Sequence, residues 1–285
     1  MEVSRVYMLA SDHRWQWEEW CDSAGVPRAR ISEVKNLVFE AFAAARERSD
    51  DVASHGVLLL DTIYGAEAVR RARAAGFPVG TPVEKAGVFP LEWQSDPFHQ
   101  EQEGNSFVKV LVRYRPEWPP VAKDEQMRKL LELQAWCRAQ NTVLLIEIVI
   151  MRKDEDEHEF EERGRPRLLA SLIRESYDRG LVPHIWKIEG TGSAEGAAEI
   201  DDAIRERPEA RQVILGKGAD TATIARWFAT AAPLPSTAGF AIGRSVFWNP
   251  GTAYLTGRMA AVDAIEMMAS TYLSLIDQWH SASEP

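Results

Sequence analysis

The sequence predicts a single-domain (β/α)8 barrel that extends over residues 1–285. Eight apolar segments of strand length recur along the chain, and amphipathic helical segments separate most of them. The strand-length segments are apolar throughout rather than alternating, which is typical of strands covered on both faces in parallel sheets. Repeated strand-then-helix order predicts parallel βαβ units. Eight such units match a closed barrel, and a doubly wound open sheet is the main alternative.

The first half of the chain contains four of the predicted strands and three helices. The residues from Ser32 to Arg48 form a predicted helix because their apolar residues recur at helical spacing. Ala66–Ala75 is a second predicted helix, and Gly76 followed by Pro78 ends it as helices commonly end. A third helix is predicted for Asp124–Gln140. The strands are predicted at Tyr7–Ala10, Gly56–Asp61, Val79–Glu84 and Phe107–Arg113.

The second half repeats this order of elements. Arg167–Arg179 is a predicted helix closed by Gly180, and Met259–Trp279 is the predicted final helix. The charged run Arg152–Arg165 is predicted to be a solvated loop after the fifth strand and a candidate for a mobile lid. The remaining strands are predicted at Thr142–Ile150, His184–Glu189, Gln212–Gly216 and Gly239–Gly243.

The composition disfavours several classes of partner. Asp and Glu number 43 and Lys and Arg number 33, so the formal net charge is −10. An acidic protein is repelled by nucleic-acid phosphates and by anionic membrane surfaces, and we expect neither as a partner. The chain has no apolar run of about 18 residues, and its first residues lack the pattern of a secretion signal. We therefore expect a cytoplasmic protein that does not enter a membrane.

Cysteine and histidine spacing indicates no metal or disulfide framework. Cys21 and Cys137 are the only cysteines, and they form no C-x-x-C pair, so we expect reduced thiols. The histidines show neither H-x-H nor H-E-x-x-H spacing. We expect no metal and no cofactor. A small-molecule substrate is the expected partner, and a homo-oligomer is compatible with this class of barrel.

Ionisable residues concentrate at the predicted C-terminal ends of the strands. In a (β/α)8 barrel these ends meet at the mouth that carries the active site. Charges inside apolar strands are costly unless paired or solvated, and Lys109, Glu147 and Lys187 each have apolar neighbours on both sides. The strand-end charges are Asp12, Arg14, Asp61, Glu84, Lys85, Lys109, Arg113, Glu147, Lys187, Glu189, Lys217 and Arg244.

Lys187 is the clearest candidate for a reactive amine. A lysine that forms a Schiff base must be neutral near pH 7, whereas an ordinary lysine has a pKa of about 10.4. Burial and a nearby cation such as Lys109 both lower a lysine pKa. The alternative is a buried lysine in an ion pair with Glu147 or Glu189. Glu147 itself is either a proton shuttle or only the counter-ion of a lysine.

Three residues near the ends of the first two strands have two interpretations each. Asp12 and Asp61 either orient substrate hydroxyls and accept protons, or form ordinary salt bridges at strand ends. His13 either hydrogen-bonds the substrate or lies outside the site. The residue types alone leave these alternatives open.

Two glycine-flanked basic segments predict an anion site. Gly216, Lys217 and Gly218 follow the seventh strand, and Gly243 and Arg244 follow the eighth. Barrels often bind phosphate in these two loops through backbone N–H groups at a helix start. Glycine permits close approach of the backbone, and the basic side chain adds charge. The alternative is that these glycines serve only tight turns.

The ordered strand-end segments resemble the class I aldolase superfamily, which includes tagatose 1,6-bisphosphate aldolase and sulfofructose phosphate aldolase. The closest resemblance is to the aldolase-like domain at the C-terminus of many bacterial 5-dehydro-2-deoxygluconokinases. The segments that carry it are Met8–Arg14, Leu60-Asp61 with Tyr64-Gly65, Glu84-Lys85, Lys109–Tyr114, Trp186–Gly190, Leu215-Gly216 with Gly218–Asp220, and Gly239–Arg244.

The resemblance implies a (β/α)8 barrel and a class I aldolase that cleaves a phosphorylated keto sugar or keto acid. The implied reaction is retro-aldol cleavage of 2-deoxy-5-keto-gluconate 6-phosphate to dihydroxyacetone phosphate and malonic semialdehyde. The candidate catalytic residues are Lys187 as the Schiff-base lysine, Glu147 for acid–base chemistry, Asp12 and Lys109. The candidate substrate-binding residues are His13, Arg14, Asp61, Glu84, Arg113 and Glu189. The candidate phosphate-binding residues are Gly216, Lys217, Gly218, Gly243 and Arg244.

The sequence also departs from the related domains. Ile148–Arg152 stands where they tend to have a Pro-containing loop, Arg115 where we expect Asn, and Lys217 where Arg is more usual. The substrate can therefore differ from the inositol-pathway acid. Two other functions stay open: a non-catalytic or regulatory sugar-phosphate-binding protein on an aldolase scaffold, and another phosphosugar barrel such as an isomerase.

Overall fold

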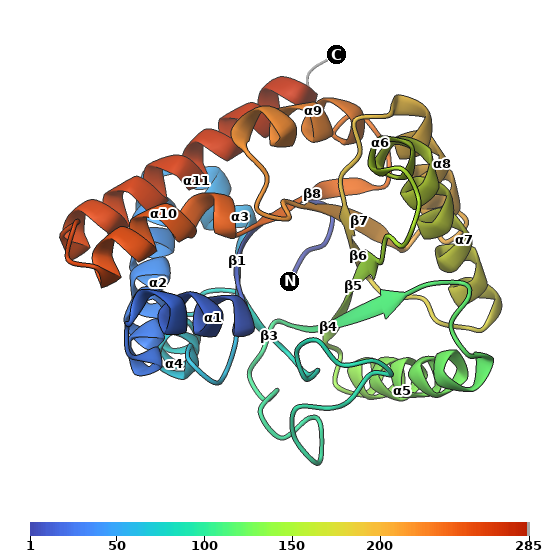
Figure 1. Cartoon of the computed structure of the whole chain (residues 1–285), viewed down its shortest axis with the longest axis horizontal. Coiled ribbons are helices and arrows are strands. Elements are labelled where there is room, and N and C mark those ends of the chain that lie inside the picture. The colour runs from blue at the N-terminus through green and yellow to red at the C-terminus, as the bar shows by residue number, and fades with distance from the viewer. Residues whose placement is uncertain (284–285) are drawn as a thin grey trace.

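The computed structural model, which describes residues 1–283, contains eight parallel strands that close into a barrel in chain order (Figure 1). β1 pairs with β2 on one side and closes the barrel on β8 on the other. The predicted (β/α)8 barrel is therefore confirmed, and the doubly wound open sheet is excluded. The strands are β1 (Val6–Ser11), β2 (Gly56–Leu60), β3 (Val79–Pro82), β4 (Phe107–Tyr114), β5 (Val143–Ile150), β6 (Ile185–Glu189), β7 (Arg211–Leu215) and β8 (Thr237–Ile242).

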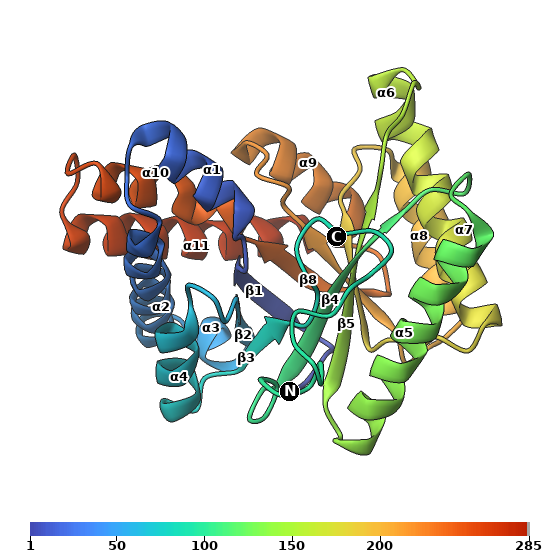
Figure 2. The same cartoon turned by 60° about the horizontal axis from the view of Figure 1, so that its bottom comes forward.

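Helices surround the barrel and cover the outer faces of the strands (Figures 1 and 2). Those before β5 are α1 (Trp15–Ala24), α2 (Ile31–Arg48), α3 (Asp50–His55), α4 (Ala66–Ala74) and α5 (Pro120–Ala139), with a 3₁₀ turn at Arg28–Arg30. Those after it are α6 (Glu157–Glu159), α7 (Arg165–Asp178), α8 (Ala194–Arg205), α9 (Thr221–Ala231), α10 (Arg244–Leu255) and α11 (Ala261–Ser283). Among residues 1–283, no helix combines the length and apolar composition that a membrane span requires.

Several predicted elements have somewhat different limits in the structure, among them the final helix and the charged run after β5. The predicted final helix, Met259–Trp279, is present as α11, which follows a turn at Gly257 with a φ of 73° and runs from Ala261 to Ser283. The charged run Arg152–Arg165 is only partly a loop. Asp156 caps α6, a π-helical turn spans Phe160–Gly164, and the Phe160 side chain is buried beneath it.

Three apolar clusters form the core. Two lie between the strands and the surrounding helices, one on each side of the barrel. The third fills the barrel interior, because alternate residues of each strand point inward. This inner cluster forms the floor on which the polar residues of the mouth stand, and its members include Val6, Met8, Ala10, Leu59, Phe107, Leu145, Ile185 and Val213.

Candidate active site

A cavity of about 320 Å³ opens at the C-terminal ends of the strands. The structure brings together in its wall every predicted site residue except Asp61. Those residues are Asp12, His13, Arg14, Glu84, Lys109, Arg113, Glu147, Lys187, Glu189, Gly216, Lys217, Gly218, Gly243 and Arg244.

Strand alternation places the three central charges. Lys109 follows the inward-facing Phe107 by two positions on β4, and Glu147 follows Leu145 by two positions on β5. Successive side chains of a strand point to opposite faces, so both charges face the barrel interior. Glu147 pairs in register with Lys187 on β6, which puts the two side chains next to each other on neighbouring strands.

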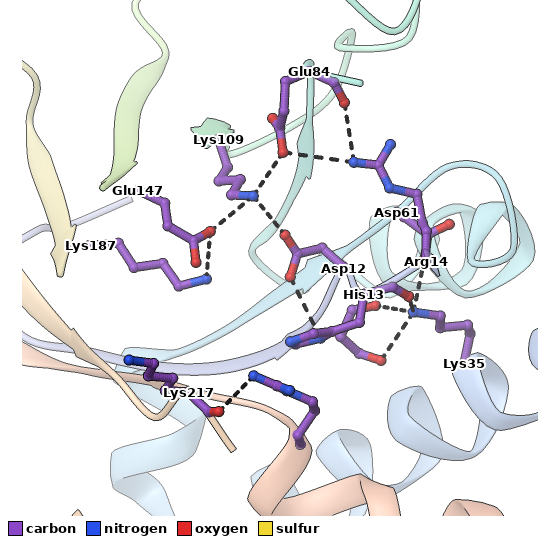
Figure 3. Close-up of polar contacts among 12 residues, drawn as sticks. Asp12, His13, Arg14, Lys35, Asp61, Glu84, Lys109, Glu147, Lys187 and Lys217 are labelled. Atoms are coloured by element: carbon purple, nitrogen blue, oxygen red, sulfur yellow. Dashed lines mark hydrogen bonds and ion pairs between the residues drawn. The ribbon is translucent and has the colours of Figure 1, made fainter. Parts of the chain in front are cut away.

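Lys109 forms the centre of a buried charge cluster (Figure 3). Its ammonium nitrogen lies 3.0 Å from a carboxylate oxygen of Asp12, 2.9 Å from Glu84 and 2.9 Å from Glu147. The Lys109 side chain is 2% exposed. Three carboxylates around one ammonium occupy all three of its N–H donors.

The pKa values of this cluster follow from the same contacts. Burial alone would lower the pKa of Lys109, but the attraction of Asp12, Glu147 and Glu84 outweighs it and raises that pKa. Burial alone would raise the pKa values of Asp12 and Glu147, but Lys109 and Lys187 hold both below their usual values. Asp12 and Glu147 are therefore ionised at neutral pH, and Lys109 is a cation beside them.

Lys187 has a different environment from Lys109. Its ammonium nitrogen lies 3.0 Å from Glu147, and within residues 1–283 this is its sole ion pair. The side chain is 5% exposed and lines the cavity. The amine is thus buried, faces the space a ligand would occupy, and has one carboxylate to which it can pass a proton.

Glu84 and Arg14 form the wall beside β3. The Arg14 guanidinium donates to the Glu84 carbonyl at 3.1 Å and to Gln94 at 3.1 Å, and it lies 3.7 Å from the Glu84 carboxylate. Burial raises the pKa of Glu84, because Lys109 and Arg14 offset it only in part. β3 itself ends at Pro82, short of the predicted Glu84, although the Val83 amide still donates to the Lys109 carbonyl of β4 at 3.0 Å. Glu84 instead belongs to a short antiparallel bridge with Trp93.

His13 is a partly buried, neutral imidazole in the cavity wall. Burial lowers its pKa to about 3, and the cations Arg244, Lys35 and Lys187 act in the same direction against the opposing effect of Asp12. Its ring packs edge-on against Phe247, with the centroids 5.6 Å apart. At neutral pH it can therefore exchange hydrogen bonds with a ligand but carries no charge.

The loops after β7 and β8 meet at Arg244. The Arg244 guanidinium donates to the Lys217 carbonyl at 2.6 Å, and the Ser245 hydroxyl donates to the Ala219 carbonyl at 2.7 Å. The backbone at Gly218 has a φ of 79°, which glycine adopts without strain. The Lys217 ammonium lies 2.7 Å from Glu189, so its charge is already paired. Within residues 1–283, the Arg244 guanidinium has no carboxylate partner.

Arg113 is the second cavity arginine whose charge is not paired. It lies on β4, half-way around an eight-stranded barrel from β8, and its side chain faces the cavity near Gly87. Among the described residues, no carboxylate lies within ion-pair distance of its guanidinium. The cavity therefore presents two unpaired positive charges on opposite walls.

The structure places Asp61 outside this cavity. Its side chain is fully buried, and its carboxylate lies 2.9 Å from the ammonium of Lys35 on α2. Reasoning from strand ends missed Lys35. A signal for it exists, because Lys35 lies between Ile31 and Val38 in the apolar stripe of its helix, where a charge must have a buried partner. In the part of the chain that the structure describes, no group of His, Cys, Asp and Glu side chains is arranged to hold a metal ion.

Comparison with known proteins gives a family and a fold. A family described as an uncharacterized protein conserved in bacteria (DUF2090) matches residues 1–283. The chain belongs to this family. No protein of curated function matches the sequence.

Solved aldolases have a similar fold. The fructose-bisphosphate aldolase from Plasmodium falciparum is 12% identical with a TM-score of 0.72, covering 100% of this chain and 92% of that one. An archaeal fructose-1,6-bisphosphate aldolase, solved with its catalytic lysine covalently bound to the carbinolamine intermediate, is 13% identical with a TM-score of 0.57. That match covers 97% of this DUF2090 chain and 94% of the archaeal one. At such identities the likeness shows the barrel fold alone.

Proposed function

We propose that this DUF2090 protein is a class I aldolase in which Lys187 forms a Schiff base with a phosphorylated keto sugar or keto acid. The observation that carries the proposal is the contrast between the two buried lysines. Lys109 contacts three carboxylates and stays a cation, whereas Lys187 faces the cavity with Glu147 at 3.0 Å as its single partner. The fold that the chain shares with Schiff-base aldolases supports the same assignment.

The mechanism begins with proton transfer from the Lys187 ammonium to Glu147. The neutral amine then attacks the substrate ketone, and Glu147 returns the proton to the carbinolamine hydroxyl, which leaves as water. In the resulting iminium ion the nitrogen withdraws electrons from the adjacent carbon–carbon bond. Glu147, or its neighbour Asp12, removes the proton of the β-hydroxyl, the bond breaks, and an aldehyde leaves. Protonation of the enamine and hydrolysis of the imine release the second product and restore Lys187.

The two unpaired arginines support a substrate that is anionic at both ends. Arg244, with the backbone amides of the adjacent loops, would hold a phosphate, and Arg113 on the opposite wall would hold a second anion. The substrate 2-deoxy-5-keto-gluconate 6-phosphate fits this pattern, with a phosphate at one end and a carboxylate at the other. Its cleavage between carbons 3 and 4 gives malonic semialdehyde and dihydroxyacetone phosphate.

Borohydride trapping tests the proposal. The protein is incubated with dihydroxyacetone phosphate, reduced with sodium borohydride, and analysed by intact mass and peptide mapping. We expect one adduct on Lys187, and none in Lys187→Ala, while Lys129→Met on the outer helix α5 is labelled as the wild type is. Binding of the ligand without an adduct would contradict the imine and favour an isomerase or a non-catalytic sugar-phosphate-binding protein.

A further inference from the structure

Lys35 ties together the ends of two barrel strands from outside the cavity (Figure 3). Its side chain is fully buried on α2, and its ammonium donates to the carbonyls of Ser11 and His13, the latter at 2.8 Å. The Asp61 carboxylate lies 2.9 Å away. These three contacts account for all three N–H donors of the lysine.

The tied segment carries side chains of the candidate active site. The β1 ladder with β2 ends at the pairing of Ser11 with Leu60, so the next residues have no strand partner to hold them. Asp12 and His13 follow directly, and both line the cavity. The two carbonyls that accept from Lys35 belong to Ser11 and His13, the residues on either side of Asp12. These two hydrogen bonds hold the backbone where strand pairing has ended.

Asp61 fixes the other end of this link. One carboxylate oxygen accepts from the backbone amides of Ile63 at 3.0 Å and Tyr64 at 2.7 Å, and the other faces Lys35. Asp61 thus holds the turn after β2, and Lys35 joins that turn to the one after β1.

Stability alone does not explain such a pair. Replacing a buried ion pair by neutral residues of similar volume is often neutral or stabilising, because desolvation offsets the Coulomb attraction. A hydrophobic residue at position 35 would suit the apolar stripe of α2 equally well. What a hydrophobic residue cannot supply is the pair of hydrogen bonds to the carbonyls around Asp12.

We propose that Lys35 is a positioning residue that sets the placement of Asp12 and His13 in the active site, with Asp61 as its counter-ion. The inference rests on the proposed aldolase function for its catalytic consequence. Its structural consequence, the ordering of the segment 11–14, is independent of that function. A misplacement of about 1 Å in a catalytic group costs up to about 100-fold in rate.

The experiment compares Lys35→Met, Asp61→Asn and the double variant. Each single change leaves one buried charge without a partner, so we expect both to lower the melting temperature. The double change removes both charges, and the amide oxygen introduced by Asp61→Asn still accepts from the two backbone amides, so we expect the melting temperature to recover. We expect kcat of the double variant to remain about 10- to 100-fold below wild type, with KM changed less because Lys35 makes no contact with Arg244 or with the loop after β7, which would hold the phosphate.

Hydrogen exchange gives a readout that does not depend on the reaction. In the double variant we expect faster exchange in the peptide spanning residues 11–16 and unchanged exchange elsewhere. Lys129→Met is the matched control, because Lys129 also donates from a helix to a backbone carbonyl, that of Leu91, at 2.7 Å. It should leave both readouts unchanged.

The outcomes separate the two proposals. A double variant with wild-type kcat and wild-type exchange in residues 11–16 would show that Lys35 and Asp61 have only a structural role, and would overturn the inference. If the wild type gives no borohydride adduct but the double variant shows faster exchange at residues 11–16, the aldolase proposal fails while the positioning of that segment stands.

Discussion

Replacing Lys109 with methionine removes the cation at the centre of the buried cluster. Its ammonium lies 2.9–3.0 Å from Asp12, Glu84 and Glu147. At such distances one pair of opposite charges attracts by about 5–6 kcal/mol at an effective dielectric constant of about 20, before desolvation is subtracted. Removing one partner of a buried ion pair costs about 3–5 kcal/mol in net stability. We expect a loss of this size for Lys109→Met.

The pH dependence of this loss has a definite sign. In the wild type, Lys109 and Lys187 hold the pKa values of Asp12 and Glu147 below their usual range. Those carboxylates therefore stabilise the fold above about pH 4, and that contribution is lost as the pH falls through their folded-state pKa values. Without Lys109, burial dominates and the pKa values rise above those of the unfolded chain. The variant must then lose further stability as the pH rises from about 5 to about 8.

Urea unfolding near pH 5 and again near pH 8 measures this loss of stability, with circular dichroism as the signal. The control is Lys85→Met, because Lys85 pairs with Glu92 at 2.8 Å in an ion pair that is half-exposed on both sides. We expect little change for Lys85→Met at either pH. A Lys109→Met protein that loses the same free energy at both pH values would refute the electrostatic account and leave only lost packing.

Three further predictions concern the cavity wall. Arg244→Ala should raise KM for a phosphorylated substrate by about 10- to 100-fold, because a charge-assisted hydrogen bond is worth about 1.5–3 kcal/mol. An unchanged KM in steady-state kinetics would contradict a phosphate contact by Arg244. Arg113→Ala should raise KM for a substrate with a second anion while leaving trapping by dihydroxyacetone phosphate intact; equal losses with both ligands would contradict a second anion subsite. Gly243→Ala should lower the melting temperature, because an added Cβ would overlap the Ala10 carbonyl oxygen, and a calorimetric scan that matches wild type would contradict this close approach.

The barrel and most of the residues of the cavity wall could be predicted from the sequence. A charged residue that points into the barrel stands out in the sequence, because it interrupts an otherwise apolar strand. Lys109, Glu147 and Lys187 are residues of this kind. The strand order of a parallel barrel then brings them together without further information. The same pattern predicts that Asp61 joins them, but the structure places its carboxylate outside the cavity, paired with Lys35 on α2.

The features that sequence reasoning missed depend on contacts between distant segments. Nothing local distinguishes Asp61 at the end of β2 from Asp12 beyond β1, since each follows a buried strand. The difference is Lys35, which lies 26 positions before Asp61 in the chain. Its ammonium pairs with Asp61, whereas Asp12 pairs with Lys109 in the cavity. Helix α10 was missed for another reason. Pro250 and Gly251 interrupt its pattern, although the helix continues through both.

The charge of the cavity connects these findings to substrate capture. The whole chain carries −10, yet the cavity is lined by six cationic side chains and four carboxylates, with His13 neutral. Four of the cations have carboxylate partners, so the local excess is carried by Arg113 and Arg244. A concave site of opposite sign to the protein surface focuses the field on anionic ligands, and added salt weakens that attraction. If both arginines contact the substrate, kcat/KM must fall with ionic strength more steeply in the wild type than in Arg113→Ala, and parallel salt dependences would place Arg113 outside the binding path.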